Sequence, residues 1–409
     1  MSDVSVLEVL LYDEPIGTLT RLTGDRTIFV FNEDYIRKKD RATLGLYFKD
    51  SHGELVTDFR PYQTRVMPYF SNMLPEGQLR EYLANRAGIR SQREFFLLWV
   101  LGQDLSGAVT VRPYDGDSLP PDADELPEAD HREDADDLMR FSLAGIQLKF
   151  SAVMEKSGGL TIPARGVGGS WIVKLPSPKF QNVPENEYSM MDLARKLGMN
   201  VPEIKLLSID EVNDLPEGMD RLGNSVFAIR RFDRDGQDGR RIHTEDFAQV
   251  FGLFPEKKYE RASYLNIAEV LGIETSDEDV AEFIRRLVFN TLIGNADMHA
   301  KNWSLIYHDR KRPSLSPAYD FVATVAYLPD EKSALKYSRT KRMDEFTLDE
   351  LSHLAARARL PETMVLDVAK ETVNRFRELW PVESKNLPID KAAIDVINAH
   401  IAKLPIADI

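Results

Sequence analysis

The sequence predicts an α+β fold of two lobes, the first rich in β-strands and the second mainly helical. In the first lobe, short runs of branched and aromatic residues such as Trp171–Leu175 and Ser225–Arg230 are typical of strands. From Thr244 to the C-terminus, apolar residues recur at helical spacing, with one interruption near Trp303. A chain that changes from one periodicity to the other along its length favours two lobes of different architecture.

A further segment precedes these lobes and is set off by composition. Residues 115–137 are acidic, rich in proline and poor in apolar side chains, as a linker or exposed loop would be. The length of 409 residues allows two or three domains. We therefore expect an accessory α+β subdomain of the strand-rich lobe at residues 1–113, an acidic proline-rich linker or loop at 114–138, the strand-rich lobe at 139–235 and the helical lobe at 236–409.

Local patterns predict the elements in chain order. In the accessory subdomain we expect strands at residues 6–12, 16–19 and 27–31, then helices at 75–87 and 92–101. The strand-rich lobe should contain strands at residues 149–154, 171–175, 204–208 and 225–230, with a helix at 186–197. In the helical lobe a helix should end near Ile293 and a short strand should begin near Trp303.

Composition excludes several classes of protein. The chain has no cysteine, which excludes disulfides, thiolate zinc sites and cysteine nucleophiles and fits a reducing cytoplasm. The first residues lack the pattern of a signal peptide, and the longest apolar run, near residues 95–101, is too short to cross a membrane. A net charge of −14 argues against a chain that coats nucleic acid by itself.

The most informative stretch runs from Gly294 to Asn302 in the helical lobe. Asp297 and Asn302 stand five positions apart, and Asp320 follows within Tyr-Asp-Phe. A base Asp, an Asn five residues later and then a metal-binding Asp have the spacing of a protein kinase catalytic loop. Asp297 would accept the proton of an attacking hydroxyl, and Asn302 and Asp320 would offer oxygen ligands to Mg²⁺. His299 and Lys301 within the loop make the pattern more specific than the Asp–Asn pair alone.

A cation for nucleotide phosphates is predicted in the strand-rich lobe. Lys174 ends an apolar strand, and Glu187 lies thirteen residues later on a predicted helix. Kinases use such a pair to fix the phosphate-contacting lysine. By itself Lys174 would fit a strand-end lysine that reaches water, but together with the acids of the helical lobe it favours a phosphate contact. No Gly-x-Gly-x-x-Gly loop is present, and the nearest candidate cradle is the one-glycine segment at residues 142–149.

Six ordered motifs resemble the HipA family of bacterial serine/threonine kinases. They are Ser-x-Ala-Gly-x-Gln-x-Lys from residue 142, Val-Lys-Leu-Pro from 173, Asn-Glu-Tyr from 186, Arg-Phe-Asp-Arg from 231, Glu-Asp-Phe-Ala-Gln from 245 and Asp-x-His-x-Lys-Asn from 297. Residues 69–77 and 105–109 also resemble the N-terminal subdomain of that family. The resemblance covers nearly the whole chain and implies a bilobal kinase-like fold. HipA proteins are the toxin halves of type II toxin–antitoxin pairs.

The resemblance implies roles for matching positions. Asp297 corresponds to the catalytic base, Asn302 and Asp320 to the Mg²⁺ ligands, and Lys301 would lie beside the transferring phosphoryl group. In the hinge, Phe232 should pack on adenine and Asp233 should approach the ribose, whereas Arg230 stands where an acid would be expected. Ser142 corresponds to the autophosphorylated serine of the loop that covers the phosphates. The expected nucleotide-binding set is Ser142, Ala144, Gly145, Gln147, Lys149, Lys174, Glu187, Arg230, Phe232, Asp233, His299 and Asp320.

As the resemblance implies, the chain would be a cytoplasmic ATP- and Mg²⁺-dependent protein kinase that arrests growth. It would be restrained by a small helix-turn-helix antitoxin and, through it, would associate with operator DNA. Substrates in the family include aminoacyl-tRNA synthetases. Autophosphorylation at Ser142 would inactivate it.

Other interpretations stay open. A small-molecule phosphotransferase of the aminoglycoside or choline kinase type shares the acid spacing, and a pseudokinase that only docks the antitoxin would keep the fold. The basic residues Lys332, Lys336, Arg339, Lys341 and Arg342 fit a surface that receives a phosphate or an acidic protein, and equally a solvated face.

Overall fold

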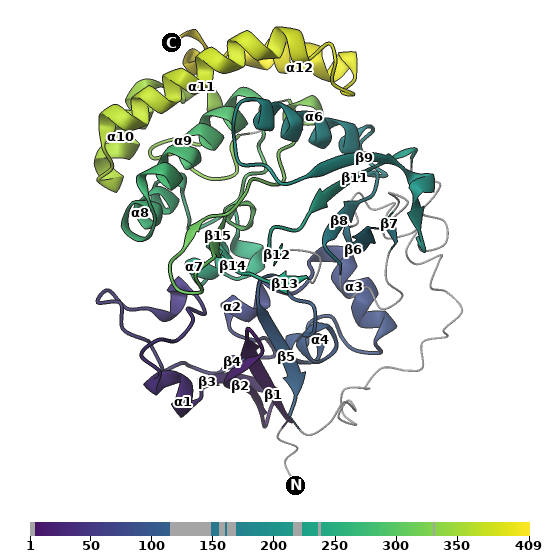
Figure 1. The fold of residues 1–409 in the computed structure, drawn as a ribbon, viewed down its shortest axis with the longest axis vertical. Coiled ribbons are helices and arrows are strands. Elements are labelled where there is room, and N and C mark those ends of the chain that lie inside the picture. The colour runs from purple at the N-terminus through teal and green to yellow at the C-terminus, as the bar shows by residue number, and fades with distance from the viewer. Residues whose placement is uncertain are drawn as a thin grey trace.

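The computed structural model describes residues 5–114, 149–154, 160–161, 169–215, 223–235, 239–329 and 332–409. Three regions are visible in Figure 1: an N-terminal sheet at the bottom, a strand-rich region at the right and a helical region at the top. The predicted α+β architecture is confirmed.

The N-terminal region is an antiparallel sheet with strand order β4-β3-β2-β1-β5. Its elements are β1 (Ser5–Leu11), β2 (Glu14–Leu22), β3 (Arg26–Phe31), α1 (Glu33–Arg37), β4 (Tyr62–Gln63), α2 (Pro68–Ser71), α3 (Gly77–Arg86), α4 (Glu94–Leu101) and β5 (Val109–Pro113). Residues along β1 and β3 alternate between buried and more exposed, so one face of the sheet packs on a core that includes Phe48, Phe70 and Phe96. The strands and helices expected here are all present.

The strand-rich region holds a sheet with order β10-β7-β6-β8-β11-β9. Its elements are β6 (Lys149–Met154), β7 (Leu160–Thr161), β8 (Trp171–Lys174), α6 (Val183–Lys196), β9 (Ile204–Ser208), β10 (Val212–Asn213) and β11 (Ser225–Arg230). In the strand register, Lys174 of β8 lies opposite Phe227 of β11 on one side and Lys149 of β6 on the other. Lys174 therefore lies on a central strand of the sheet. The predicted helix begins at Val183, earlier than the expected Asn186, because Pro184 is favourable in a first helical turn.

The helical region surrounds a small sheet with order β14-β15-β16. Its elements are β12 (Arg234–Asp235), β13 (Arg240–Arg241), β14 (His243–Asp246), α7 (Phe247–Val250), α8 (Tyr264–Glu274), α9 (Asp277–Leu292), β15 (Ser304–Tyr307), β16 (Ser314–Leu315), α10 (Leu348–Ala358), α11 (Glu362–Glu383) and α12 (Lys391–Ile401). Helix α9 is central, since it packs against α8 and α11. In Figure 1, α10, α11 and α12 form the outer layer at the top.

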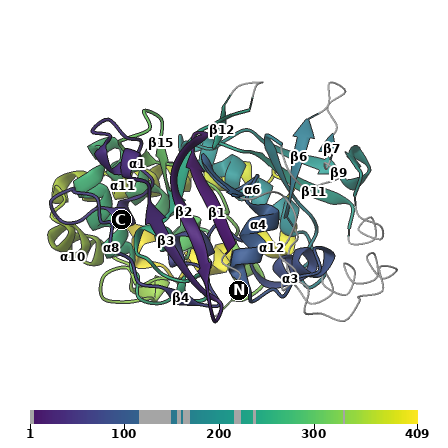
Figure 2. The same ribbon diagram turned by 90° about the horizontal axis from the view of Figure 1, so that it is seen from below.

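Buried polar contacts join the N-terminal region to the helical region. Glu245 of β14 accepts hydrogen bonds from the Leu46 amide, at 2.9 Å, and from the Tyr307 hydroxyl. The Tyr69 hydroxyl lies 3.2 Å from Nε2 of His243. Figure 2 shows the sheet of β1, β2 and β3 lying across the molecule from below. The accessory subdomain is thus in direct contact with the lobe that carries the predicted catalytic loop.

Candidate active site

The end of α9 sets the start of the predicted catalytic loop. Ser276 caps the helix by accepting from the Asp279 amide at 3.3 Å, and acidic residues of the first turn favour the positive end of the helix dipole. The helix stops before Gly294, which has φ +69°. A Cβ at Gly294 would lie 2.6 Å from Cγ1 of Val325, so only glycine fits this turn without displacement.

Short-range hydrogen bonds then shape the loop around Asp297. The Asp297 amide donates to Oδ1 of Asn295 at 3.1 Å, and the His299 amide donates to the Asp297 carbonyl at 2.8 Å. Nδ2 of Asn302 donates to the same carbonyl at 2.8 Å. Asp297 and Asn302 are therefore held at opposite ends of one closed turn, with the Asp297 side chain exposed to solvent.

The Asp297 carboxylate has a partner outside the loop. The Tyr259 hydroxyl donates to its Oδ1 at 2.5 Å. Although Asp297 reaches solvent, the protein packed around its carboxylate removes part of its hydration and raises the pKa of Asp297 above its ordinary value, whereas the Tyr259 hydrogen bond and the charge of Lys258 act in the opposite direction. A carboxylate that reaches solvent with a raised pKa is suited to accept a proton from a hydroxyl.

Asp320 faces the catalytic loop across the site. It has φ +58°, a left-handed conformation that Asp tolerates better than most residues, and its carbonyl accepts from Nδ2 of Asn295 at 3.2 Å. Oδ2 of Asp320 lies 3.4 Å from Nζ of Lys149, and Oδ1 contacts Nζ of Lys174. Burial alone would raise the pKa of Asp320, but Lys149 and Lys174 lower it far below its usual range.

Lys174 is shared by two carboxylates. Its ammonium contacts Glu187 of α6 and Asp320, so the ion pair predicted with Glu187 is confirmed. Although burial disfavours the ammonium, these two carboxylates raise the pKa of Lys174, which stays charged. The pKa of Glu187 is raised by burial, and its Oε2 is buried without a hydrogen-bond partner. The arrangement places a fixed cation beside the predicted metal ligand.

The oxygens available suit a cation brought by a nucleotide. Nδ2 of Asn302 donates to the backbone carbonyl of Asp297, which leaves the side-chain oxygen Oδ1 of Asn302 for a ligand. Asp320 supplies one carboxylate. Among the residues that the structure describes, no three His, Asp or Glu side chains form a preformed metal cluster. Mg²⁺ at kinase sites is held by one or two protein groups, with phosphate oxygens and water completing its shell. Asn302 and Asp320 therefore fit such an ion.

His299 and Lys301 differ in environment. Nδ1 of His299 is buried without a hydrogen-bond partner, and burial lowers the pKa of His299 to about 3, so the imidazole is neutral. Lys301 points toward the accessory subdomain, where its Nζ lies 2.5 Å from Oε1 of Glu76 and 2.9 Å from the carbonyl oxygen of Asn72. The contact expected between Lys301 and a phosphoryl group stays a prediction.

The hinge segment has a structural network that sequence patterns did not predict. Asp233 accepts from Nη2 of Arg231 at 2.9 Å, from Nη1 of Arg234 at 2.8 Å and from the Gly107 amide at 2.8 Å. Both arginines also bind Asp104, at 3.3 and 3.0 Å. The carboxylate of Asp233 is thus buried and fully occupied, which favours a structural role over the expected ribose contact.

Two other hinge residues, Phe232 and Arg230, lie outside this buried network. The Phe232 ring lies 5.7 Å from the Tyr319 ring, next to the Asp320 backbone, where it could meet a planar base. Arg230 is exposed, and its guanidinium lies 3.8 Å from Glu203. Ser142, Ala144, Gly145 and Gln147 lie outside the described residues, so the phosphate-covering loop stays a prediction.

The basic segment after Asp320 lies against the same side of the site. Nζ of Lys341 donates to the carbonyl oxygens of Tyr259, at 3.2 Å, and Ala334, at 2.7 Å. Arg339 is held by Asp349 and Glu350, whereas Lys336 is exposed. Part of this positive charge is therefore structural, and the two interpretations of the segment stay open.

Sequence reasoning did not single out Tyr259, Lys258, Asn72 or Glu76 as site residues. Residues 69–77 had been noted only as a resemblance motif, and nothing local to Tyr259 connects it with a loop 38 residues later.

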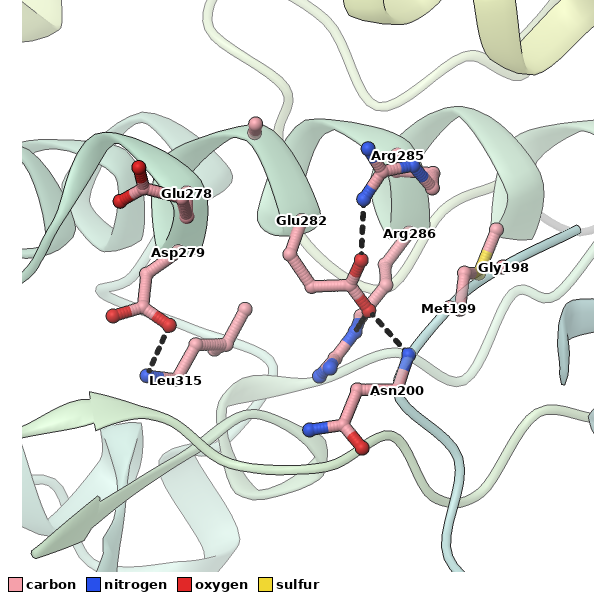
Figure 3. A pocket seen from close by; sticks show the side chains of 10 residues that line it. Gly198, Met199, Asn200, Glu278, Asp279, Glu282, Arg285, Arg286 and Leu315 are labelled. Atoms are coloured by element: carbon pink, nitrogen blue, oxygen red, sulfur yellow. Dashed lines mark hydrogen bonds and ion pairs between the residues drawn. The ribbon is translucent and has the colours of Figure 1, made fainter. Parts of the chain in front are cut away.

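A separate depression of about 410 Å³ lies on the flank of α9. Figure 3 shows Glu282 at its centre, bound to Arg285 at 2.5 Å, Arg286 at 2.8 Å and the Asn200 amide at 3.1 Å. These internal bonds satisfy the Glu282 carboxylate and connect the segment between α6 and β9 to α9, so we assign no ligand to this depression.

Comparisons with known proteins agree with the resemblance. The family model described as HipA-like C-terminal domain matches residues 141–380, and the model described as HipA N-terminal domain matches residues 7–112. A protein designated a candidate kinase, Y4dM of Sinorhizobium fredii, is 57% identical over 98% of this chain and 97% of its own length. The serine/threonine-protein kinase toxin HipA of Shewanella oneidensis is 27% identical over 78% of this chain and 76% of its own length.

A solved structure shares the fold. The complex of HipA, HipB and operator DNA from Shewanella oneidensis contains a chain that superposes with a TM-score of 0.72 at 21% identity, covering 98% of this chain and 96% of that one. In the part of the chain that the structure describes, no helix is long and apolar enough to cross a membrane.

Proposed function

Because this chain belongs to the HipA family, we propose that it is an ATP- and Mg²⁺-dependent serine/threonine protein kinase. The observation that carries the proposal is the meeting of Lys174, Glu187 and Asp320 at one point, opposite the turn that holds Asp297 and Asn302. In this proposal the two lobes bring together a cation for the phosphates, a ligand for the metal and a base for the hydroxyl.

Each group has a defined task in phosphoryl transfer. Lys174 would hold nucleotide phosphates, and Asn302 and Asp320 would hold Mg²⁺, which neutralises phosphate charge when bound. Asp297 would accept the proton of the substrate hydroxyl, and the Tyr259 hydrogen bond would keep its carboxylate oriented. Phe232 would contact the adenine. Transfer at such sites depends on positioning and charge stabilisation rather than on covalent chemistry with the protein.

The test is transfer of labelled γ-phosphate from ATP·Mg²⁺ by the purified protein, with Asp297→Asn as the matched variant. We expect transfer to protein by the wild type, and a loss of about two to four orders of magnitude in Asp297→Asn with ATP binding retained. Label that enters only small hydroxyl or amine compounds would support a small-molecule phosphotransferase instead. Nucleotide binding without any transfer would support a pseudokinase.

Regulation by phosphorylation is a second part of the proposal. Ser142 would be autophosphorylated and the modified protein would lose ATP binding, because the added charge of about −1.5 to −2 competes for the groups that bind ATP phosphates. Intact mass and peptide mapping after incubation with ATP·Mg²⁺ test this. One phosphate at Ser142 in the wild type and none in Asp297→Asn is the expected result. A Ser142 phosphoform that still binds ATP normally would contradict it.

Membership of the HipA family also suggests the partners of this chain. We propose that a helix-turn-helix antitoxin restrains the kinase and links it to operator DNA, and that the substrate is a cytoplasmic translation protein such as an aminoacyl-tRNA synthetase. The HipA–HipB–DNA complex of Shewanella oneidensis supports the partner. Co-expression with the protein encoded next to this gene should give a stable complex and relieve growth arrest.

A further inference from the structure

The turn that precedes α3 brings an acid of the accessory subdomain onto the catalytic loop. Oε1 of Glu76 lies 2.5 Å from Nζ of Lys301, and Oε2 lies 2.8 Å from Nζ of Lys258. The carbonyl of Asn72, from the same turn, accepts from Lys301 at 2.9 Å. Both contacts of the Lys301 ammonium therefore come from a region more than two hundred residues earlier in the chain.

The two lysines that Glu76 binds are both connected to the catalytic loop. Lys301 directly precedes Asn302, and the Lys258 carbonyl accepts from the Ala300 amide at 3.2 Å. The charge of Lys258 acts on Asp297, whose pKa it lowers. Within the described residues, Glu76 is the carboxylate that pairs with each lysine. One anion thus serves two cations.

The environment makes this contact stronger than an ordinary surface pair. Lys301 and Lys258 side chains are 14% and 20% exposed, and Glu76 is 33% exposed. Burial would raise the pKa of Glu76, but the two lysines lower it to about 2, so the carboxylate is charged at neutral pH. A half-buried carboxylate with two fixed partners restricts both long side chains.

We propose that Glu76 is a positioning residue for the kinase site, supplied by the accessory subdomain, which fixes the ammonium groups of Lys301 and Lys258 at the catalytic loop. The inference rests on the proposed kinase function, because Lys301 matters only where a phosphoryl group is transferred. It assigns the N-terminal region a direct part in organising the catalytic loop.

The same interface offers a matched control. Arg65 of the accessory subdomain binds Glu256 of the helical region at 2.6 and 3.1 Å, but neither residue contacts the catalytic loop in the described structure. Glu256→Gln therefore removes one anion and one bridge between the same two regions. It separates loss of docking from loss of lysine positioning.

The experiment compares wild type, Glu76→Gln, Lys301→Met, the double variant and Glu256→Gln. Phosphate transfer is followed at saturating ATP·Mg²⁺, and ATP·Mg²⁺ affinity is measured by calorimetry. We expect Glu76→Gln to slow transfer about tenfold or more, since Lys301 loses its orientation. It should also tighten ATP·Mg²⁺ binding, since a negative charge beside an anion site is removed. Glu256→Gln should stay within about twofold of wild type in both measurements.

The double variant decides whether Glu76 acts through Lys301. If it does, adding Glu76→Gln to Lys301→Met changes the transfer rate by less than about twofold, whereas independent effects multiply. Glu76→Asp should restore part of the rate. Multiplying effects, or weaker ATP binding together with slower transfer in Glu76→Gln, would overturn the inference in favour of a purely structural contact. If the wild type transfers no phosphate, the proposed function fails and the inference fails with it, whereas a Glu76→Gln variant that transfers phosphate as fast as an active wild type overturns the inference alone.

Discussion

The hydroxyl of Tyr259 donates a 2.5 Å hydrogen bond to Oδ1 of Asp297, and the Tyr259 ring meets the ring of His299 edge-on at 4.9 Å. Tyr259 belongs to the connection that leads into α8, so the orientation of the base depends on a segment outside its own loop. The pair also affects proton affinity, because a donor to a carboxylate stabilises its charged form.

Removing that donor should shift the pH dependence of transfer. In Tyr259→Phe the ring remains, but the pKa of Asp297, already raised by burial, should rise further. The base must be deprotonated to act, so the acidic limb of the transfer rate should move to higher pH. A rate–pH profile with ATP·Mg²⁺ saturating measures the shift. An acidic limb that stays in place or moves to lower pH would show that Tyr259 does not tune Asp297.

Asp320→Asn should weaken Mg²⁺-dependent ATP binding. The change removes the charged metal ligand and one of the two carboxylates that contact Lys174, so ATP·Mg²⁺ affinity should fall roughly tenfold or more. Calorimetry with and without Mg²⁺ measures this. Asp344→Asn, which removes an exposed carboxylate paired with Arg342, controls for net charge. Equal Mg²⁺-dependent affinity in Asp320→Asn and wild type would exclude Asp320 as a ligand.

Asp233→Asn should destabilise the fold more than it affects nucleotide binding. It leaves Arg231 and Arg234 buried with less compensating charge, and breaking such a network costs about 3–5 kcal/mol. Denaturant unfolding measures the loss. Asp235→Asn, whose partner Arg240 is largely exposed, should change the free energy of unfolding by less than about 0.5 kcal/mol. If Asp233 serves the ribose instead, stability would be retained while ATP affinity falls.

Stability should depend on pH through Glu245. Burial raises its pKa to about 8, far above the value of an unfolded glutamate. The unfolded chain therefore releases the Glu245 proton at a lower pH than the folded protein does. The contribution of Glu245 to the free energy of unfolding is complete below about pH 4 and is lost as pH rises to about 8. Glu245→Gln cannot ionise, so its free energy of unfolding should improve relative to wild type between pH 5 and pH 9. If the free energies of unfolding of Glu245→Gln and wild type differ by the same amount at every pH in this range, Glu245 is not neutral in the folded protein.

The sequence by itself determined the parts that depend on neighbours along the chain. Apolar patterns predicted β1, β8 and the end of α9, because burial of one face requires the same spacing wherever the element lies. The five-residue separation of Asp297 and Asn302 was enough to predict one loop that carries both residues, and the hydrogen bond between them spans only that loop. The ion pair of Lys174 and Glu187 was also predictable, because a strand and the following helix are adjacent in space.

Only the tertiary structure decided which distant groups meet at these local elements. Three contacts of the site join residues whose local sequence patterns do not indicate their partners. They are the contacts of Tyr259 with Asp297, of Glu76 with Lys301 and of the two arginines with Asp233. An exposed acid and a buried, paired acid look alike in a sequence, because their difference lies in the desolvation and charge that the packed regions impose. For this chain, the docking of the N-terminal sheet onto the helical region supplies those surroundings, and with them the proton affinities and orientations of the site.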